Sequence, residues 1–303
     1  ILIGIFNSRS GLYLESYAEG ENSIEYIYRE FSTMDESLIA STQRGITKIA
    51  KLKPSPITIS EAAEDVYFQR QVVMLHPPGA RFSTPPTEVP VEHVFGPLAT
   101  PGDIWTRNVL PLAQECLDGK DTIFCVVGSD NSGKSFLLNG VKGINQLALR
   151  WLIASAREKA AQDSGGAFQY TMKLRFFEVY NEYVIDLLGA NREVIVPKDT
   201  NDGVVLQGLS SVSIFTIDDA VTAIDGGHAK QNLSQKRKTS TFLQIELCQT
   251  DHRNNLGVVS RFTIAELLAT NPLAEDREAI QLREGFNGFR SMFTLKEIAH
   301  NWQ

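Results

Sequence analysis

The chain has 303 residues, of which 43% are hydrophobic and 21% are charged, and its formal net charge is −7. This composition indicates a globular protein with one large or two medium domains. The acidic balance argues against a general nucleic-acid binder, because such proteins usually carry a surplus of Lys and Arg, and no apolar run approaches the ~20 residues that span a membrane.

In the first part of the chain, the pattern predicts strands at 1–6 and 66–75, a Pro-rich connection that leads to 89–95, and a helix at 100–119. Residues 10–65 are mixed in character, and we interpret them as an irregular or inserted region. Because the chain starts at Ile1 rather than Met, we expect it to be a fragment of a longer protein.

The rest of the chain alternates between the hydrophobic pattern of strands, with a period of about 2 residues, and that of helices, with a period of about 3.6 residues. Strands are expected at 122–127, 170–179, 185–188, 241–247 and 258–268, a hairpin of 194–196 with 204–206 around the turn at 199–203, and helices from near 135, at 144–161, at 217–224 and from 276 onward. Interleaved strands and helices predict a three-layer α/β fold with a mixed sheet.

The most informative segment follows the strand at 122–127. It matches G-x-x-x-x-G-K-[ST], the phosphate-binding loop, and its residues are Gly128, Ser129, Asp130, Asn131, Ser132, Gly133, Lys134 and Ser135. Its glycines let backbone N–H groups converge on phosphate oxygens, and the following helix N-terminus adds partial positive charge. Lys134 would reach the β- and γ-phosphates, and the Ser135 hydroxyl would ligate Mg²⁺. The alternative interpretation is a glycine-rich turn before an ordinary helix.

Further motifs occur in a fixed order around this loop. Glu92-His-Val-Phe-Gly-Pro97 precedes it, and Phe177-Glu-Val-Tyr-Asn-Glu182 with Ile185-Asp-Leu-Leu188, Gly203-Val-Val-Leu-Gln-Gly-Leu209 and Gln281-Leu-Arg-Glu-Gly-Phe-Asn287 follow it. The series resembles the kinesin motor domain, whose versions read D-x-V-F-G-P, G-Q-T-G-S-G-K-T, E-I-Y-N-E-x-I-x-D-L-L, G-V-x-V-x-G-L and L-K-E-x-x-x-I-N-x-S-L. The resemblance covers roughly residues 89–298.

The resemblance implies one motor domain over residues 1–303 with a kinesin-like P-loop fold, in which helices flank a central mixed, mainly parallel sheet. The last strand and helices of that fold lie beyond the chain. Either the fragment omits them, or another segment, such as part of 10–65, supplies the strand. The implied activity is that of a microtubule-stimulated ATPase that uses ATP or ADP and Mg²⁺ and is located in the cytoplasm on the cytoskeleton.

Both switch motifs of the family are altered. The first switch, N-x-x-S-S-R-S-H, corresponds to residues 236–240, where Lys236 and Arg237 replace the serine pair and Thr239 stands in for the third serine. The second switch, D-L-A-G-S-E, corresponds to residues 266–271. Glu266 could address Mg²⁺ through water, whereas Ala269 replaces the glycine that senses the γ-phosphate.

Asn271 replaces a carboxylate that relays a proton, and an amide cannot be that base. The resemblance therefore implies that nucleotide binds but that hydrolysis is slow or absent, with Thr239 and Glu266 as the catalytic candidates. An alignment that is shifted by a few residues is the alternative. Arg9 is the candidate for the arginine that contacts adenine in the family, and a surface arginine at the end of a strand is its alternative.

Residues 281–302 correspond to the helix that lies on the microtubule in kinesins. Arg283, Arg290 and Lys296 would attract acidic tubulin, or they form a solvated basic helix face. A partner chain could join through a coiled coil outside the fragment, whereas nucleic acid and membrane are not expected partners.

Two hypotheses follow from the altered switches: a divergent motor domain that binds microtubules and ATP·Mg²⁺, and a non-motile scaffold of the same fold. An unrelated P-loop NTPase is the third reading, and the segment at 180–188 argues against it. Scattered histidines and three cysteines without metal-like spacing predict no transition-metal site, and the cysteines favour a reducing, intracellular compartment.

Overall fold

A computed structural model describes the backbone of residues 2–7, 47–51, 72–75, 87–90, 92–96, 98–128, 132–140, 142–163, 165–166, 168–180, 183–190, 194–195, 198–200, 203–232, 239–252 and 256–268. Contacts within the chain divide it into two compact units. The first consists of Ile1–Thr100, Cys125–Ser135 and Leu267–Gln303, and the second consists of Pro101–Phe124 and Phe136–Glu266.

The first unit contains strands from the beginning of the chain. β2 (Thr47–Lys51) pairs antiparallel with β1 (Leu2–Asn7) and parallel with β5 (His93–Phe95), and β6 (Thr122–Val127), whose second half belongs to this unit, follows β1 in the sheet. β2 falls inside the region 10–65 that we interpreted as irregular. Part of that region therefore forms a regular strand. A separate ribbon joins β3 (Val72–Leu75) to β4 (Thr87–Pro90).

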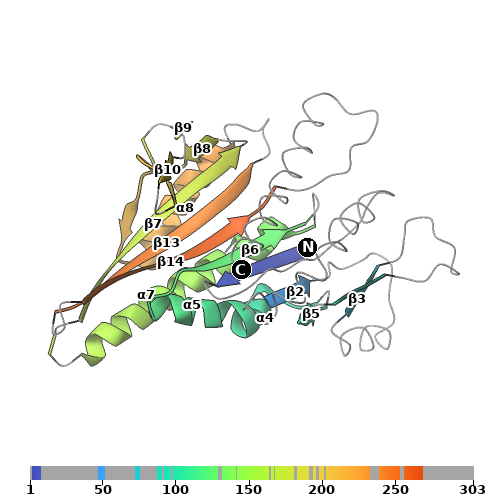
Figure 1. Cartoon of the computed structure of the whole chain (residues 1–303), viewed down its shortest axis with the longest axis horizontal. Coiled ribbons are helices and arrows are strands. Elements are labelled where there is room, and N and C mark those ends of the chain that lie inside the picture. The colour runs from blue at the N-terminus through green and yellow to red at the C-terminus, as the bar shows by residue number, and fades with distance from the viewer. Residues whose placement is uncertain are drawn as a thin grey trace, which may run out of the picture. The chain divides into compact units, whose positions relative to one another are not determined.

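Three long strands dominate the second unit (Figure 1). They are β7 (Phe168–Tyr180), β13 (Ser240–Asp251) and β14 (Leu256–Glu266), and β13 lies antiparallel between the other two. β8 (Tyr183–Asp186) and β12 (Val212–Ile214) flank β7, and β9 (Val194–Ile195) extends from β8.

The sheet is mixed and flanked by helices, as the sequence predicted. Of the pairs with a described register, all are antiparallel except β2 with β5. Antiparallel pairing follows from connectivity for β7 with β8 and for β13 with β14, because short hairpins join the strands of each pair.

Helices cover the apolar face of these strands. α5 (Leu110–Leu117), α7 (Ile144–Gln162) and α8 (Ile217–Asn232) contact one another in that order and pack on β14 and β7. α8 is twice as long as the predicted 217–224, because Gly227 does not end it. The Phe176 ring lies 2.3 Å from where a Cβ on Gly227 would be, so the glycine permits close packing of helix on strand.

The helix expected at 100–119 forms with an irregularity. α4 (Pro101–Ile104) passes into a π-helical turn, η1 (Trp105–Val109), before α5 begins. Among the described residues, no helix is both long and apolar enough to cross a membrane.

The hairpin predicted around 199–203 uses a different first strand. β10 (Lys198–Thr200) pairs with β11 (Gly203–Val205), whereas Val194–Ile195 joins β8 instead. The position of the turn was predicted correctly. The loop has only two residues, however, so the strands that pair are those directly beside it, with Thr200 opposite Gly203.

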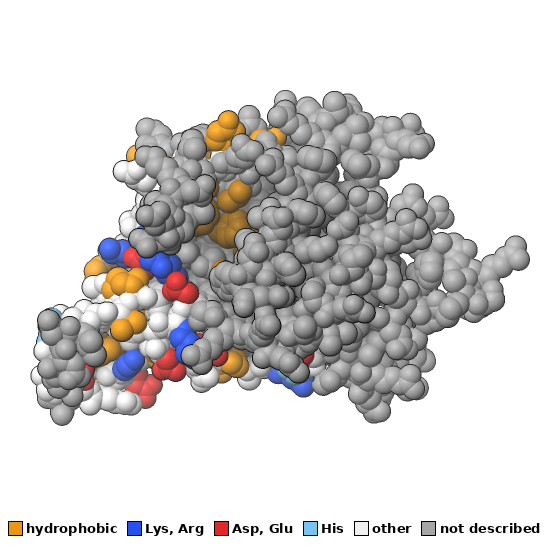
Figure 2. All heavy atoms as spheres, viewed as in Figure 1, with side chains coloured by type: hydrophobic (Ala, Val, Ile, Leu, Met, Phe, Trp, Pro, Cys, Tyr) orange, Lys and Arg blue, Asp and Glu red, His pale blue; other side chains and the backbone are white. Residues whose placement is uncertain are grey.

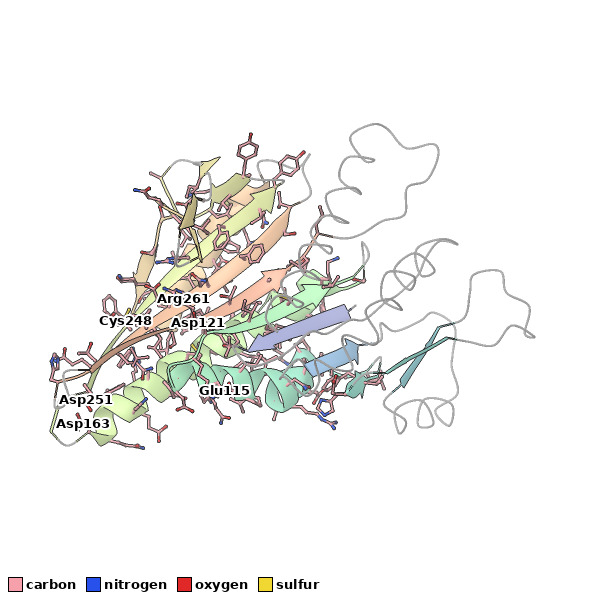
Figure 3. The ribbon with its side chains drawn as sticks, in the orientation of Figure 1. Glu115, Asp121, Asp163, Cys248, Asp251 and Arg261 are labelled. Carbon is pink, nitrogen blue, oxygen red and sulfur yellow. The ribbon has the colours of Figure 1, made fainter. Side chains whose placement is uncertain are left out.

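The long strands have two chemically different ends. At the hairpin end, Asp251 is paired with Phe168, and Asp163 accepts a hydrogen bond of 2.6 Å from the Phe168 N–H; Figure 3 shows the two aspartates lying there together. The opposite end contains Glu178 and Glu266.

Candidate phosphate site and polar strand ends

The phosphate loop begins at the end of a buried strand in the first unit. Val126 and Val127 are buried, and the Val126 carbonyl accepts a hydrogen bond of 2.9 Å from the Leu267 N–H. Gly128, which follows, is also buried. The loop therefore starts from a fixed point, while Ser129, Asp130 and Asn131 lie outside the described residues.

The second half of the loop contains its phosphate-binding groups. Gly133 has φ of +98°, a conformation that only glycine adopts without strain. Lys134 is only 8% exposed, and its ammonium donates a hydrogen bond of 2.7 Å to the Gly128 carbonyl. The Lys134 side chain thus crosses back over the loop, and Ser135 at the loop's end is exposed.

Ser132 carries a buried polar atom with no protein partner. The residue is 2% exposed, and its Oγ makes no hydrogen bond. An unpartnered buried hydroxyl costs free energy unless another group satisfies it. A buried ammonium, an unpartnered hydroxyl and a glycine-shaped turn fit a phosphate group, because its oxygens can accept hydrogen bonds from both donors.

The helix expected from near 135 begins at Lys134 and is short. α6 (Lys134–Leu138) is five residues long, and α7 begins at Ile144. The link is compact, because Gly140 has φ of +86° and a Cβ on Gly143 would lie 2.3 Å from the Asn139 carbonyl oxygen. Asn145 Nδ2 donates to Asn139 Oδ1 at 2.9 Å. A helix this short contributes little dipole, so the expected helix-terminus attraction is weakened.

The two catalytic candidates lie at the same end of the sheet in the second unit. Thr239 immediately precedes β13 and Glu266 ends β14. The register places Thr241 opposite Glu266 on one side and opposite Glu178 on the other, so Glu178, Thr241 and Glu266 share one face.

Glu178 is the residue that sequence reasoning left without a role. It is 1% exposed, and its Oε1 accepts a hydrogen bond of 2.7 Å from Thr239 Oγ1. The sequence did contain a signal for this role. Residues 172, 174 and 176 of the same strand face are buried and apolar, and Glu178 continues that row with a carboxylate.

Other predicted site residues cannot be placed. Outside the described residues lie Arg9, Lys236, Arg237, Ala269, Asn271, Arg283, Arg290 and Lys296. Among the described residues, no group of three or more His, Cys, Asp or Glu side chains is arranged to hold a metal ion.

Asp186, the aspartate of the Asp-Leu-Leu motif, organises two loops. Its Oδ1 accepts hydrogen bonds from the N–H groups of Leu188 (2.8 Å) and Gly189 (3.1 Å), and its Oδ2 accepts one from Ser210 (2.8 Å). Burial alone would raise the pKa of this carboxyl, but the hydrogen bonds from Ser210, Leu188 and Gly189 outweigh burial and lower it.

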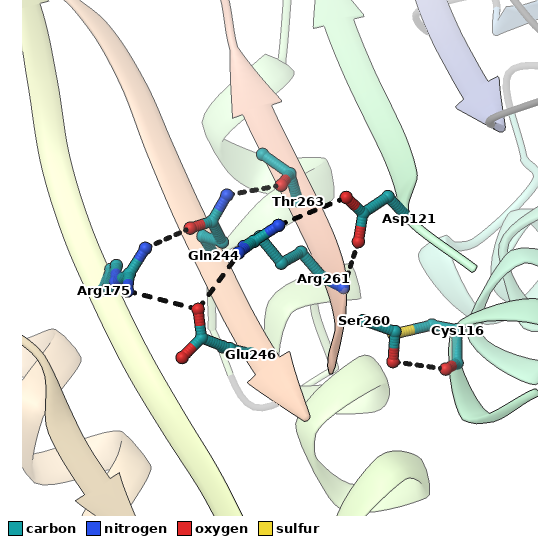
Figure 4. A network of polar contacts seen from close by, with 8 residues as sticks. All are labelled: Cys116, Asp121, Arg175, Gln244, Glu246, Ser260, Arg261 and Thr263. Carbon is teal, nitrogen blue, oxygen red and sulfur yellow. Dashed lines mark hydrogen bonds and ion pairs between the residues drawn. The ribbon is translucent and has the colours of Figure 1, made fainter. Parts of the chain in front are cut away.

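The face of the long strands away from the helices carries a charged network (Figure 4). Glu246 Oε2 contacts Arg175 at 3.1 Å and Arg261 at 3.4 Å, and Arg261 also contacts Asp121 at 3.3 Å. Figure 2 shows charged side chains of both signs side by side on the part of the surface that is described. The network connects three strands, and although Arg175 Nε is buried without a partner, the other contacts of Arg175 are to Glu246 and Gln244 within the network, so we interpret it as structural.

The buried cysteines do not form a nucleophilic site. Burial raises the pKa of the Cys116 thiol to about 12, although the hydrogen bond with Ser260 opposes the shift, and burial also raises the pKa of Cys125. Neither thiol is ionised near neutral pH, whereas the thiolate is the nucleophile. Cys125 is a core residue of β6.

Comparison with known proteins identifies the family. The model of the kinesin motor domain matches residues 76–302. The kinesin-like protein KIN-14G of Arabidopsis thaliana is 27% identical over 169 residues, which cover 52% of this chain and 16% of that relative. The kinesin-like protein KIN-5B of Oryza sativa subsp. japonica is 24% identical over 263 residues, which cover 76% of this chain and 24% of that relative.

A solved structure of a fast kinesin has the same fold. It is similar with a TM-score of 0.64 and 15% identity, and the similarity covers 80% of this chain and 71% of that one. Its title concerns the ATPase mechanism and interactions with microtubules of that protein. The expected α/β fold of a mixed sheet flanked by helices is thereby confirmed, and the chain spans a quarter or less of the two relatives.

Proposed function

Since this chain belongs to the kinesin motor-domain family, we propose that it is a microtubule-binding motor domain that binds ATP·Mg²⁺ and hydrolyses it slowly or not at all. The observation that carries nucleotide binding is the phosphate loop, in which Lys134 is buried and the buried Ser132 hydroxyl has no protein partner. The altered switch residues carry the second part of the proposal.

The loop residues have distinct roles in this proposal. Lys134 would move its ammonium from the Gly128 carbonyl to the β- and γ-phosphate oxygens, and Ser132 would donate its hydroxyl proton to a phosphate oxygen. Ser135 would hold Mg²⁺ through its hydroxyl, and Arg9 would contact the adenine. Bound Mg²⁺ supplies charge that neutralises the phosphates.

Hydrolysis needs groups that position water and accept its proton. Thr239 and Glu266 are the remaining candidates, with Thr239 at the start of β13 and Glu266 at the end of β14. Ala269 and Asn271 cannot replace the backbone freedom and the base that the family uses there. Since phosphoryl transfer depends on positioning and charge stabilisation, losing several such groups should cost orders of magnitude in rate.

Microtubule binding is proposed from the family and from the sequence of the tail. Arg283, Arg290 and Lys296 would supply local positive charge for acidic tubulin, despite the net charge of −7. The fast kinesin of similar fold is described by its interactions with microtubules. We therefore propose that the protein acts on the microtubule cytoskeleton.

A non-motile scaffold is the second candidate, and the altered switches favour it. In this version the domain docks on microtubules or on a partner motor without turnover. The phosphate loop argues for the motor, because a pure scaffold has less need of Lys134 and Ser135.

Co-sedimentation with microtubules, with and without ATP, tests both versions when phosphate release is measured in parallel. Binding that depends on nucleotide, with slow turnover, supports the proposal. Binding that ignores nucleotide, without turnover, supports the scaffold. Turnover as fast as that of an ordinary microtubule-stimulated motor contradicts impaired hydrolysis, and no binding contradicts both versions.

A further inference from the structure

Two helices of the second unit, α7 and α8, carry exposed rows of residues with the same spacing and opposite charge. The row on α7 consists of Arg150, Ala154, Arg157 and Ala161, and the row on α8 consists of Asp218, Thr222, Asp225 and Ala229. Steps of four, three and four residues place each row on one face of its helix. Each row therefore presents two like charges, seven residues apart, separated by a small side chain.

The two helices are neighbours that run in opposite directions. They contact each other directly. Lys159, near the end of α7, donates to Gln249 at one end of β13, whereas Gln231, near the end of α8, donates to Thr241 at the other end. The positive row and the negative row therefore lie side by side and antiparallel on one layer.

One contact sets the level of the two rows relative to each other. The Arg157 guanidinium donates to the carbonyl of Phe215, which lies three residues before Asp218. Arg157 is therefore close to the level of Asp218. Seven residues of helix rise about 10 Å, so Arg150 is close to the level of Asp225. Among the described residues, no ion pair joins an arginine of one row to an aspartate of the other.

This arrangement is complementary to a second copy of itself. A two-fold axis parallel to the helices lays α7 of one copy antiparallel over α8 of the other and keeps every residue at its own level. Arg157 then faces Asp218 of the other copy, and Arg150 faces Asp225. In such an isologous interface each contact occurs twice. The small residues between the charges let the facing helices approach closely.

Phe215 adds an apolar contact at the edge of the same surface. The residue is 71% exposed, although its backbone is held on both sides, because its N–H donates to Asp219 Oδ2 at 3.0 Å and its carbonyl accepts from Arg157. An exposed aromatic ring on a fixed backbone loses little conformational entropy when it is buried, and aromatic residues are enriched in interfaces.

We propose that the exposed rows of α7 and α8, the helix-pair surface, bind a second copy of this chain in an isologous dimer. The helices have 19 and 16 residues, so the surface covers about 500 Å² per copy for helices about 10 Å wide. A standard interface buries about 800 Å² per partner. We therefore expect a dissociation constant in the micromolar range that rises with salt. This association does not depend on the proposed nucleotide binding.

Sedimentation equilibrium of the chain at micromolar concentrations, at low and at high salt, tests the proposal. Arg150→Asp/Arg157→Asp makes the whole surface acidic, and Asp218→Arg/Asp225→Arg makes it basic. Each double variant places like charges opposite one another, so its dissociation constant should rise at least about tenfold. Lys142→Asp is the control, since Lys142 is exposed and lies outside both helices, and it should stay within about twofold of wild type.

Mixing the two double variants tests the pairing itself. In an equimolar mixture the acidic surface of one variant meets the basic surface of the other at both contacts. Association should therefore return to within about threefold of wild type, although neither variant associates alone. The variant that carries all four reversals should also dimerise, because its two rows have only exchanged their signs.

Three results overturn the inference. They are a wild-type chain that stays monomeric at low salt, double variants that dimerise as wild type does, and a mixture of the double variants that does not associate. Thermal melting shows whether each variant is folded. If a double variant is unfolded, Phe215→Ser decides with the salt dependence of wild type: it should weaken dimerisation about threefold or more, and an unchanged dissociation constant contradicts the helix-pair surface.

Discussion

The phosphate loop and the segment 177–188 match the family pattern about equally well, yet their polar atoms are used in opposite ways. In the loop, Ser132 Oγ is buried without a partner, and Lys134 is bonded to the loop's own backbone. In the segment 177–188, Asp186 binds three backbone N–H groups and Glu178 binds Thr239. The phosphate loop therefore retains a buried hydroxyl that a ligand can pair with, whereas the polar side chains of the segment 177–188 hold the fold together through their described contacts.

The difference teaches how to assign a role to a motif within a family. A segment can be diagnostic because it binds or because it holds the chain in shape, and sequence alone does not distinguish the two. Polar satisfaction does, because a buried group without a partner destabilises the protein unless a ligand pairs with it. The predictions below test this distinction by changing one motif at a time.

The largest effect should follow from Lys134→Ala. Removal of the ammonium eliminates charge-assisted hydrogen bonds to two phosphates, worth about 3 kcal/mol together, so nucleotide affinity should fall at least about 100-fold. Lys142→Ala changes the net charge equally at an exposed position and should bind normally. Isothermal titration with ADP·Mg²⁺ measures both. If Lys134→Ala binds nucleotide with wild-type affinity, the loop is not part of the binding site.

Asp186→Asn should instead affect stability. The amide nitrogen would face an N–H group that now donates to Asp186, so we expect the free energy of unfolding to fall by about 2–4 kcal/mol at neutral pH. Urea denaturation measures it. Asp225→Asn, at an exposed position on α8, is the control and should change it by less than about 0.5 kcal/mol.

The pH dependence of this effect has a definite sign. The folded-state pKa of Asp186 lies below its ordinary value of 3.8. Its contribution to stability is therefore complete above about pH 4 and is lost as the pH falls through the folded-state pKa. The stability difference between wild type and Asp186→Asn should shrink below about pH 4, and a constant difference would exclude the carboxylate charge as its cause.

Much of the fold was predictable, because long periodic segments determine their own structure. The strand at 122–127, the helix at 144–161 and the strand at 170–179 are all present with small shifts at their ends. The predictions were wrong where pairing or packing with another segment determines the local structure. Val194–Ile195 pairs with β8 rather than across the nearby turn, and Gly227 continues a helix because Phe176 packs against it.

The candidate site was predictable only in part. The phosphate loop follows from local spacing, so its residues could be assigned one by one. Glu178 meets Thr239 across 61 positions of sequence, and strand register creates that contact. The end of the helix after the loop was not predicted, because that end depends on the close approach of Gly143 to the Asn139 carbonyl.

Restoring the family residues in the second switch should raise the rate of ATP hydrolysis if the phosphate loop already binds ATP. Ala269→Gly/Asn271→Glu returns backbone freedom and a carboxylate, and we expect phosphate release to increase about tenfold, less than the 10²–10⁴ of a fully assembled base, because Lys236 and Arg237 still replace the first-switch serines. Ala269→Gly/Asn271→Gln has no base and should stay at the wild-type rate. Equal gains in both variants would mean that Asn271 does not occupy the position of the base.

Ser132→Ala should give the smallest change and the sharpest contrast. Removing a buried hydroxyl without a partner should leave the free energy of unfolding unchanged or raise it by up to about 1 kcal/mol in the absence of nucleotide. The same change should weaken ADP binding about fivefold, because a neutral hydrogen bond to phosphate is lost. Thermal melting with and without ADP measures both, and opposite signs are expected only if the hydroxyl is reserved for a ligand. Loss of stability in the nucleotide-free variant would show that Ser132 helps to build the loop, as Asp186 does for the segment 177–188.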